Sequence, residues 1–316
     1  MTPFLVRRVA WALLSLLGVS LITFGLGVLS PGDPAEGIVA RRLNQPPPTE
    51  LVEAEREVLG LDRPVPQQYL SWLGRAVQGD LGTSWFRGTS VTKVLAERSR
   101  PTAALAGTAA LLSVLVGVPL GVLSAARRNS LADHLSRIAS LAGASVPSYF
   151  AAYLLILLFA VRLRLLPVFG FGTPAHLILP AITLALGPAS TLVRLTRSSV
   201  LDSAGQDFIS TARAKGLRTA AIFLRHALRN ALVPILTTVG LSLGRLLAGA
   251  IAVETVFAWP GLGELAVSAI RDHDYPLVQG VVLLSGAVYV VLNLMIDLSY
   301  AWVDPRVRGP AVLRPS

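Results

Sequence analysis

The sequence contains no cysteine and only two lysines, Lys93 and Lys215. Without cysteine the chain forms no disulfide, offers no thiolate nucleophile and holds no cysteine-ligated metal. Neither lysine follows a glycine, which excludes the phosphate-binding loop that ends in Gly-Lys-Ser/Thr. We therefore expect any ATP hydrolysis that serves this protein to occur in another chain.

Catalytic and metal-binding motifs are equally scarce. The four histidines lie in separate segments, and no two of them have the spacing of a metal-ligand pair on a helix. The sequence also lacks the nucleophile elbow of hydrolases and the paired-histidine motif of zinc proteases. We expect a chain that is not an enzyme and that binds no cofactor or metal of its own.

The most prominent feature of the sequence is its long apolar runs. Charged residues make up 15% of the 316 residues, hydrophobic residues make up 53%, and the mean hydropathy is +0.62. A helix needs roughly 20 residues to cross the hydrocarbon core of a bilayer. Six runs reach this length: residues 9–29, 102–126, 138–161, 173–193, 232–253 and 277–296. Because these runs lack the alternation of barrel strands, they predict an all-α, polytopic membrane protein with six transmembrane helices.

The first run has an alternative interpretation as a secretory signal, because Arg7 and Arg8 precede it. It is longer than the usual signal core of about 7–15 residues, and no small-residue cleavage site follows it. We expect an uncleaved anchor helix over residues 1–29, an extracytoplasmic segment over 30–101 and a five-helix core over 102–316.

The basic residues predict the orientation. With the N-terminus in the cytoplasm, segments 1–8, 127–137, 194–230 and 301–316 lie inside and carry fifteen Arg/Lys against four Asp/Glu. The long segment 30–101 lies outside and is neutral, in agreement with the positive-inside rule. The net charge of +10 therefore indicates topology and attraction to anionic lipid headgroups, and not nucleic-acid binding.

The outer segment has short helical patterns. Leu51 and Val58 share one helix face, with Thr49 as the expected cap, and Tyr69 and Trp72 lie on a second apolar stretch. The pattern fits either a cap packed on the spans or a docking surface for an external partner.

The densest basic stretch is residues 194–230, with seven Arg/Lys and two acids. We expect the preceding helix to continue through Arg197 and to break near Gly205. A short helix over 207–215, ended by Gly216, would follow. Its small residues would let a partner's backbone come close, which suggests a lever held by a cytoplasmic protein. A solvated basic loop is the alternative.

A series of short motifs runs along almost the whole chain. They are SPGDP at 30–34, LGLDRP at 59–64, GDLG at 79–82, QDF at 206–208, TARAKGL at 211–217, HALRN at 226–230, ETVF at 254–257, WPGLG at 259–263 and DPR at 304–306. Each motif is weak alone, but their order and spacing are specific. Together they resemble the permease subunits of ABC importers of the dipeptide and oligopeptide (peptide/nickel) class, and the long outer segment resembles the B-type subunit.

The resemblance implies a type I ABC importer permease fold with both termini in the cytoplasm of a bacterial or archaeal cell. Such a subunit pairs with a second permease, forming a heterodimer in the cytoplasmic membrane. It also implies two cytoplasmic ABC ATPase subunits, which use ATP and Mg, and an extracytoplasmic solute-binding protein. ATP-driven closure of the ATPases would move the lever and switch the spans between inward-open and outward-open states.

The resemblance also assigns site residues. The ATPase-coupling loop at 194–230 would act through Asp207, Phe208, Thr211, Ala212, Arg213, Ala214, Lys215, Gly216, Leu217, His226, Arg229 and Asn230. Ser210, Thr211 and Ala212 stand where the wider importer motif has Glu-Ala-Ala, so the contacts of that glutamate do not carry over. Arg245 and Glu254 are candidates for the translocation pathway, because a charge within a span costs about 3 kcal/mol on insertion scales and needs a partner or a wet cavity.

The expected cargo is a di- or oligopeptide, and related systems carry nickel chelates, glutathione or oligosaccharides. Two other classes of function fit the sequence less well. An ATP-independent secondary transporter would usually show two similar hydropathy halves, which this sequence lacks. A membrane-embedded enzyme would need a nucleophile or metal set inside the spans, and the sequence shows neither.

Overall fold

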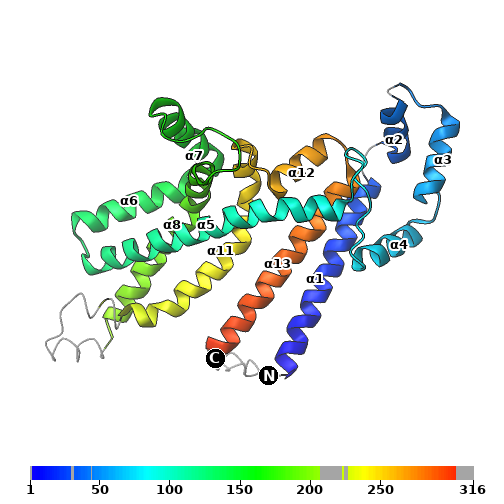
Figure 1. Ribbon diagram of the computed structural model, residues 1–316. Coiled ribbons are helices and arrows are strands. Elements are labelled where there is room, and N and C mark those ends of the chain that lie inside the picture. The colour runs from blue at the N-terminus through cyan, green and yellow to red at the C-terminus, as the bar shows by residue number, and fades with distance from the viewer. Residues whose placement is uncertain (1, 30–31, 44, 207–222, 224–226, 304–316) are drawn as a thin grey trace. The chain divides into compact units, whose positions relative to one another are not determined.

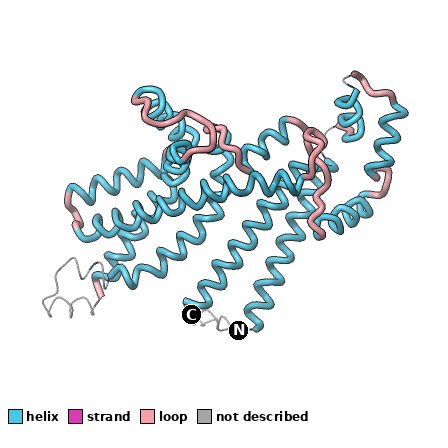
Figure 2. The backbone as a smooth tube through the Cα atoms, viewed as in Figure 1, coloured by secondary structure: helices cyan, strands magenta, loops and turns pink. Residues whose placement is uncertain are grey.

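The computed structural model describes residues 2–29, 32–43, 45–206, 223 and 227–303. Every regular element formed by these residues is a helix (Figure 2). One isolated antiparallel bridge joins Thr83 and Ser90. The elements are α1 (Thr2–Leu29), α2 (Pro34–Leu43), α3 (Thr49–Leu59), α4 (Val65–Val77), α5 (Val91–Ala126), α6 (Leu131–Ser145), α7 (Ser148–Leu155), the π-helix η1 (Ile156–Arg162), α8 (Pro174–Ala204), α11 (Leu228–Val256), α12 (Leu262–Arg271) and α13 (Tyr275–Val303) (Figure 1). The prediction of an all-α chain is confirmed.

The chain divides into two compact units. The first comprises Met1–Leu5, Arg100–Glu264 and Val291–Ser316, and the second comprises Val6–Ser99 and Leu265–Val290. The long helices α5 and α13 each contribute residues to both units.

Helix α8 is central to the first unit, where α6, α7 and α11 all pack against it. Leu179 and Leu184 of α8 share one buried cluster with Leu246 and Val253 of α11 and Leu105 of α5. Lipid tails are as apolar as leucine, so within a bilayer close van der Waals packing stabilises such contacts more than exclusion of water does.

Two glycines bring α5 close to α8. Gly117 and Gly121 have the four-residue spacing of the small-xxx-small motif of membrane helices. A Cβ atom on Gly117 would lie 2.6 Å from the Cβ of Leu192. One on Gly121 would lie 2.6 Å from the Cβ of Thr196 and 2.8 Å from the carbonyl oxygen of Val193. The α5–α8 contact therefore leaves no room for a side chain at either position.

Five of the described helical segments are long and apolar enough to cross a membrane. They are Val6–Leu29, Val91–Ala126, Pro174–Ala204, Pro234–Val256 and Tyr275–Ile296, and each contains most of one predicted run. The third predicted run, 138–161, is divided between α6 and the α7–η1 pair, which are bent by 109°. The predicted number of six spans is reached when this bent pair counts as one.

Pro147 is the physical cause of that bend. Proline has no backbone N–H to donate and forces the preceding residue away from helical angles. Val146 accordingly adopts the extended values φ −78° and ψ 123°. Pro119, Pro180 and Pro188, which also lie within predicted spans, are contained in α5 and α8 without ending them. Of these four prolines, Pro147 alone interrupts its helix.

In the second unit α1 packs against the beginning of α13. A Cβ atom on Gly286 would lie 2.6 Å from Cγ1 of Val19, and Gly27 lies against the side chain of Gln279. Residue numbers rise along one helix as they fall along the other, so the two segments are antiparallel.

The predicted outer segment forms α2, α3 and α4. Arg42 of α2 and Glu55 of α3 form an ion pair at 2.8 Å. In α4, the ring of Tyr69 lies 5.4 Å and that of Trp72 lies 5.8 Å from the ring of Phe24 in α1. This packing favours the interpretation of α4 as a cap on a span.

One local prediction is wrong, and one helix was missed. Pro48, and not Thr49, occupies the N-cap position of α3, because Thr49 already has helical geometry. Helix α12 was not predicted, because its ten residues are too few to register as a span.

The α5–α8 contact yields a prediction. Gly121→Ala should lower the unfolding free energy of the detergent-solubilised protein by about 1–3 kcal/mol, the usual cost of overpacking. Gly107→Ala on the same helix is the matched control, because a Cβ there meets nothing within 4 Å. Unfolding by SDS titration measures both changes, and equal stability of the two variants would contradict the close approach.

Candidate functional site

The coupling site implied by the resemblance lies mostly outside the described residues. This applies to Asp207, Phe208, Thr211, Ala212, Arg213, Ala214, Lys215, Gly216, Leu217 and His226. Arg229 and Asn230 lie in the first turn of α11, and Arg229 is exposed. The structure shows how the chain is packed on either side of segment 207–222.

Helix α8 leads into segment 207–222 from its N-terminal side. It continues through Arg194 and Arg197 and ends at Ala204. The N–H of Gly205 then donates to the carbonyl oxygen of Leu201 at 3.1 Å and closes the last turn. The predicted helix break near Gly205 is confirmed.

One buried apolar cluster holds both ends together. Its members come from α5, from α8, from the stretch before α11 and from the start of α11, and each is at most 7% exposed. They are Val122, Ala125, Leu192, Val200, Phe223, Ala227, Ala231 and Ile235. The chain on either side of segment 207–222 therefore packs into the same cluster.

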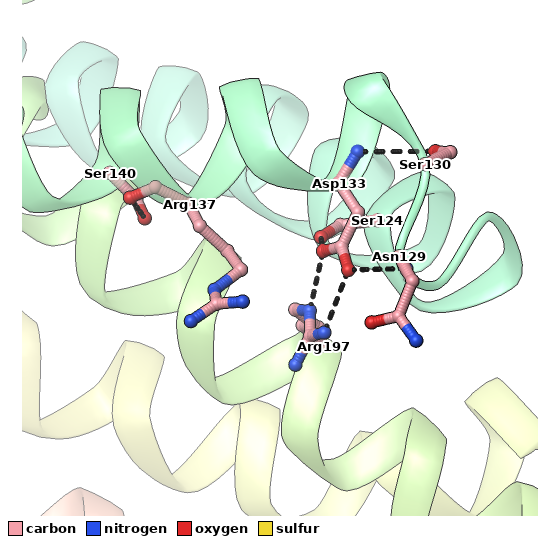
Figure 3. A network of polar contacts seen from close by, with 7 residues as sticks. All are labelled: Ser124, Asn129, Ser130, Asp133, Arg137, Ser140 and Arg197. Carbon is pink, nitrogen blue, oxygen red and sulfur yellow. Dashed lines mark hydrogen bonds and ion pairs between the residues drawn. The ribbon is translucent and has the colours of Figure 1, made fainter.

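A buried ion pair fixes α8 to the basic segment 127–137 (Figure 3). Arg197 Nε and Nη2 donate to the two carboxylate oxygens of Asp133 at 2.7 and 2.8 Å. The Asp133 side chain is fully buried, and that of Arg197 is 20% exposed. The hydroxyl of Ser124 at 2.5 Å and the N–H of Asn129 at 2.9 Å also donate to the carboxylate. Each carboxylate oxygen thus accepts two hydrogen bonds.

The local sequence explains why Asp133 sits there. Ser130 is the N-cap of α6, and its hydroxyl accepts from the N–H of Asp133. Asn129 adopts a left-handed φ of 63°, which asparagine tolerates better than most residues. The turn therefore places a carboxylate in the first turn of α6, where a negative charge is favoured by the helix dipole.

The ion pair joins two residues that are 64 positions apart in the sequence. Removing one partner of a buried pair typically costs about 3–5 kcal/mol, because the other charge is left uncompensated. The end of α8 is therefore firmly attached to the α5–α6 turn, immediately before the predicted lever.

Arg245 is exposed on α11, within one of the candidate spans. Its Nη2 lies 3.4 Å from the hydroxyl of Ser242, one turn earlier on the same helix. An exposed guanidinium at this depth calls for a wet cavity, a counter-charge or a partner chain. Its role in the pathway stays a prediction.

Glu254 has a different environment, because its side chain is fully buried. Its carboxylate accepts from the hydroxyl of Thr102 at 2.7 Å, from the N–H of Gly263 at 2.6 Å and from the N–H of Glu264 at 3.2 Å. The geometry makes Glu254 the anchor of the turn between α11 and α12. Contact with a transported solute stays a prediction.

Two further hydrogen bonds complete this anchor. The hydroxyl of Thr102 also accepts from the N–H of Leu262 at 2.8 Å. The indole N–H of Trp259 donates to the carbonyl oxygen of Pro101 at 3.0 Å, and Trp259 is itself buried. The WPGLG motif is thus a packed turn fastened to α5.

Asp274 anchors a loop in the second unit, as Glu254 does in the first. This role of Asp274 was not predicted from the sequence. Its buried carboxylate accepts from the hydroxyl of Ser84 and from the N–H groups of Trp85 and Phe86, each of these two at 3.2 Å. It therefore fixes the loop after the GDLG motif to the start of α13. An acid near the start of an apolar stretch was the available signal for Asp133 and Asp274, but Arg197 lies 64 residues from Asp133 and Ser84 lies 190 residues from Asp274.

Among the residues that the structure describes, no three or more His, Asp or Glu side chains form a group that could hold a metal ion. What the buried polar groups of these residues provide is firm attachment of loops to helices.

Comparison with known proteins finds matches along almost the whole chain. Residues 117–309 match the family model described as binding-protein-dependent transport system inner membrane component, and residues 1–106 match the model for the N-terminal part of such membrane components. The chain is 38% identical over 339 residues to the dipeptide transport system permease protein DppB of Escherichia coli (strain K12), covering 98% of this chain and 99% of that protein. It is also 38% identical over 308 residues to the glutathione transport system permease protein GsiC of Pectobacterium atrosepticum, with the same coverage.

A solved structure shares the fold. A chain of the MetNI methionine ABC transporter, in an inward-facing conformation, matches with a TM-score of 0.58 at 19% identity, over 67% of this chain and 96% of that chain. The type I ABC importer permease fold expected from the sequence is confirmed.

The Asp133–Arg197 pair yields a prediction. Arg197→Gln should lower the unfolding free energy by about 3 kcal/mol, because Asp133 stays buried without its counter-charge. The double variant Asp133→Asn, Arg197→Gln should recover part of this loss, giving a coupling of about 1–3 kcal/mol in a double-mutant cycle. Arg194→Gln, one turn earlier and exposed, is the control and should be nearly neutral. If the effects of the Asp133 and Arg197 substitutions on the unfolding free energy, measured by SDS titration, were additive, the two side chains would not be energetically coupled, and the prediction would be wrong.

Proposed function

This chain belongs to the family of binding-protein-dependent transport system inner membrane components, and on that basis we propose that it forms half of the translocation pathway of an ATP-driven peptide importer. The observation that carries this proposal is similarity over 98% of the chain to a dipeptide permease, together with the shared fold. The chain itself is a multi-pass membrane permease, and its partners would be a second permease, two ATPases and an external binding protein.

Peptide is the cargo that the relatives favour. One relative is named for dipeptides and another for glutathione, which is itself a modified tripeptide. Both kinds of molecule carry free carboxylates. The exposed guanidinium of Arg245 in a candidate span would offer such a carboxylate a counter-charge. Glutathione is the alternative cargo.

The orientation rests on charge. Segments 127–137 and 194–230 are both basic and both belong to the predicted cytoplasmic side. The ion pair between Asp133 and Arg197 joins these same two segments, which supports placing them on one side of the membrane. With these segments in the cytoplasm, both termini would also be cytoplasmic, because two predicted spans separate each terminus from them. The match to inner membrane components supports a location in the inner membrane.

Coupling would use the firm attachment of the lever's two ends. The chain on either side of segment 207–222 packs into one buried cluster, and the Asp133–Arg197 pair fixes the helix that leads into the segment. A force applied to the segment by the ATPases would therefore move α8 and α11 together. These helices pack on each other in the first unit, so the two would switch as one body.

The test is ATP hydrolysis by the complete transporter in proteoliposomes. The double variant Arg213→Glu, Gly216→Trp should reduce binding-protein-stimulated hydrolysis by about tenfold, within the usual range of allosteric coupling. The physical reason is that charge reversal and a bulky side chain would prevent the ATPases from holding the lever.

Two variants control this experiment. Arg128→Glu reverses an exposed charge in the neighbouring basic segment and should leave stimulation unchanged. Arg213→Glu alone separates the effect of charge from that of bulk. Full stimulation in the double variant, with the membrane subunits assembled, would show that the segment is only a basic flank.

A further inference from the structure

A hollow of about 550 Å³ lies between α6 and α8 in the first unit. Its basic lining consists of His134 and Arg137 from α6 and of Arg194 and Arg197 from α8. Figure 3 shows the Arg137 and Arg197 side chains projecting from these two helices.

The charges around this hollow are unbalanced. Three guanidinium groups line it, and the adjacent carboxylate of Asp133 already accepts from two nitrogens of Arg197. Arg137 and Arg194 are exposed, and neither makes an ion pair with a described residue. The hollow therefore presents two uncompensated positive charges, and its chemistry is suited to an anion.

An apolar helix face adjoins the basic groups. Leu131, Leu135, Ile138 and Leu141 follow one another on α6 at spacings of three or four residues, and they are 57–74% exposed. Ile138 and Leu141 also line the hollow itself. A soluble phosphate would make no use of this face. An acyl chain would cover the part of it that lies in the predicted span, Ile138 and Leu141, while its headgroup met the arginines.

We propose that the hollow between α6 and α8 binds the headgroup phosphate of an anionic phospholipid, with the acyl chains along the exposed apolar face of α6. Arg137 and Arg194 pair with the phosphate, and Arg197 adds positive charge nearby while it stays bonded to Asp133. Basic pockets between membrane helices on the cytoplasmic side are suited to such headgroups. The lipid then lies beside the ion pair that precedes the predicted lever.

Native mass spectrometry of the purified, complete transporter tests the proposal. The probes are phosphatidylglycerol, phosphatidylcholine and inorganic phosphate, each added to delipidated complex. Phosphatidylglycerol should bind in preference to phosphatidylcholine, and equal binding of the two lipids would overturn the proposal. In the variant Arg137→Gln, Arg194→Gln the affinity for phosphatidylglycerol should fall by roughly tenfold or more, because each basic group beside an anionic headgroup adds to the attraction.

Two matched variants distinguish the site from general attraction. Arg127→Gln, Arg128→Gln removes two exposed charges from the same basic segment outside the hollow and should keep the affinity. Arg137→Lys, Arg194→Lys keeps the charge and should retain most of the binding. Equal losses in the two glutamine variants would overturn the proposal in favour of diffuse attraction. Binding of inorganic phosphate but not of phosphatidylglycerol, with the same dependence on Arg137 and Arg194, would overturn it in favour of a soluble anion.

Discussion

The fold depends on satisfying backbone N–H groups in the turns that connect its helices, because a buried N–H without an acceptor costs free energy. Three buried carboxylates meet this need: Asp133, Glu254 and Asp274, each at most 1% exposed. Each accepts from at least one backbone N–H and one hydroxyl. In a chain with few charges, these acids hold loops where apolar packing alone would leave polar groups unpaired.

The proposed coupling would depend on the rigidity that these anchors create. Asp133 differs from the other two because it also pairs with an arginine, Arg197, on the helix that enters the predicted lever. An importer permease must transmit the movement of its cytoplasmic partner to its membrane spans, which a flexible connection between the lever and the spans would absorb. The buried salt bridge and the shared apolar cluster at the base of the predicted lever would make this connection rigid.

Much of this architecture could be predicted from the sequence, because uninterrupted apolar length is a strong signal of a span. The end of α8 near Gly205 was also predictable from local composition. The bend at Pro147 was not, since a proline inside an apolar run is compatible with a span that continues. The hydrogen bonds of Glu254 and Asp274 reach partners 152 and 190 residues away, a distance that one sequence does not reveal. The coupling residues at 207–217 stay predictions from the family resemblance.

Uptake of a labelled dipeptide into proteoliposomes is the most direct test of the proposed function. The complete transporter would be supplied with ATP on the ATPase side of the membrane and with the binding protein and the dipeptide on the other side, and a parallel preparation would lack this chain. If the chain is the permease of a peptide importer, uptake will require ATP, the binding protein and this chain together. Equal uptake without ATP, or by vesicles that lack this chain, would contradict that function.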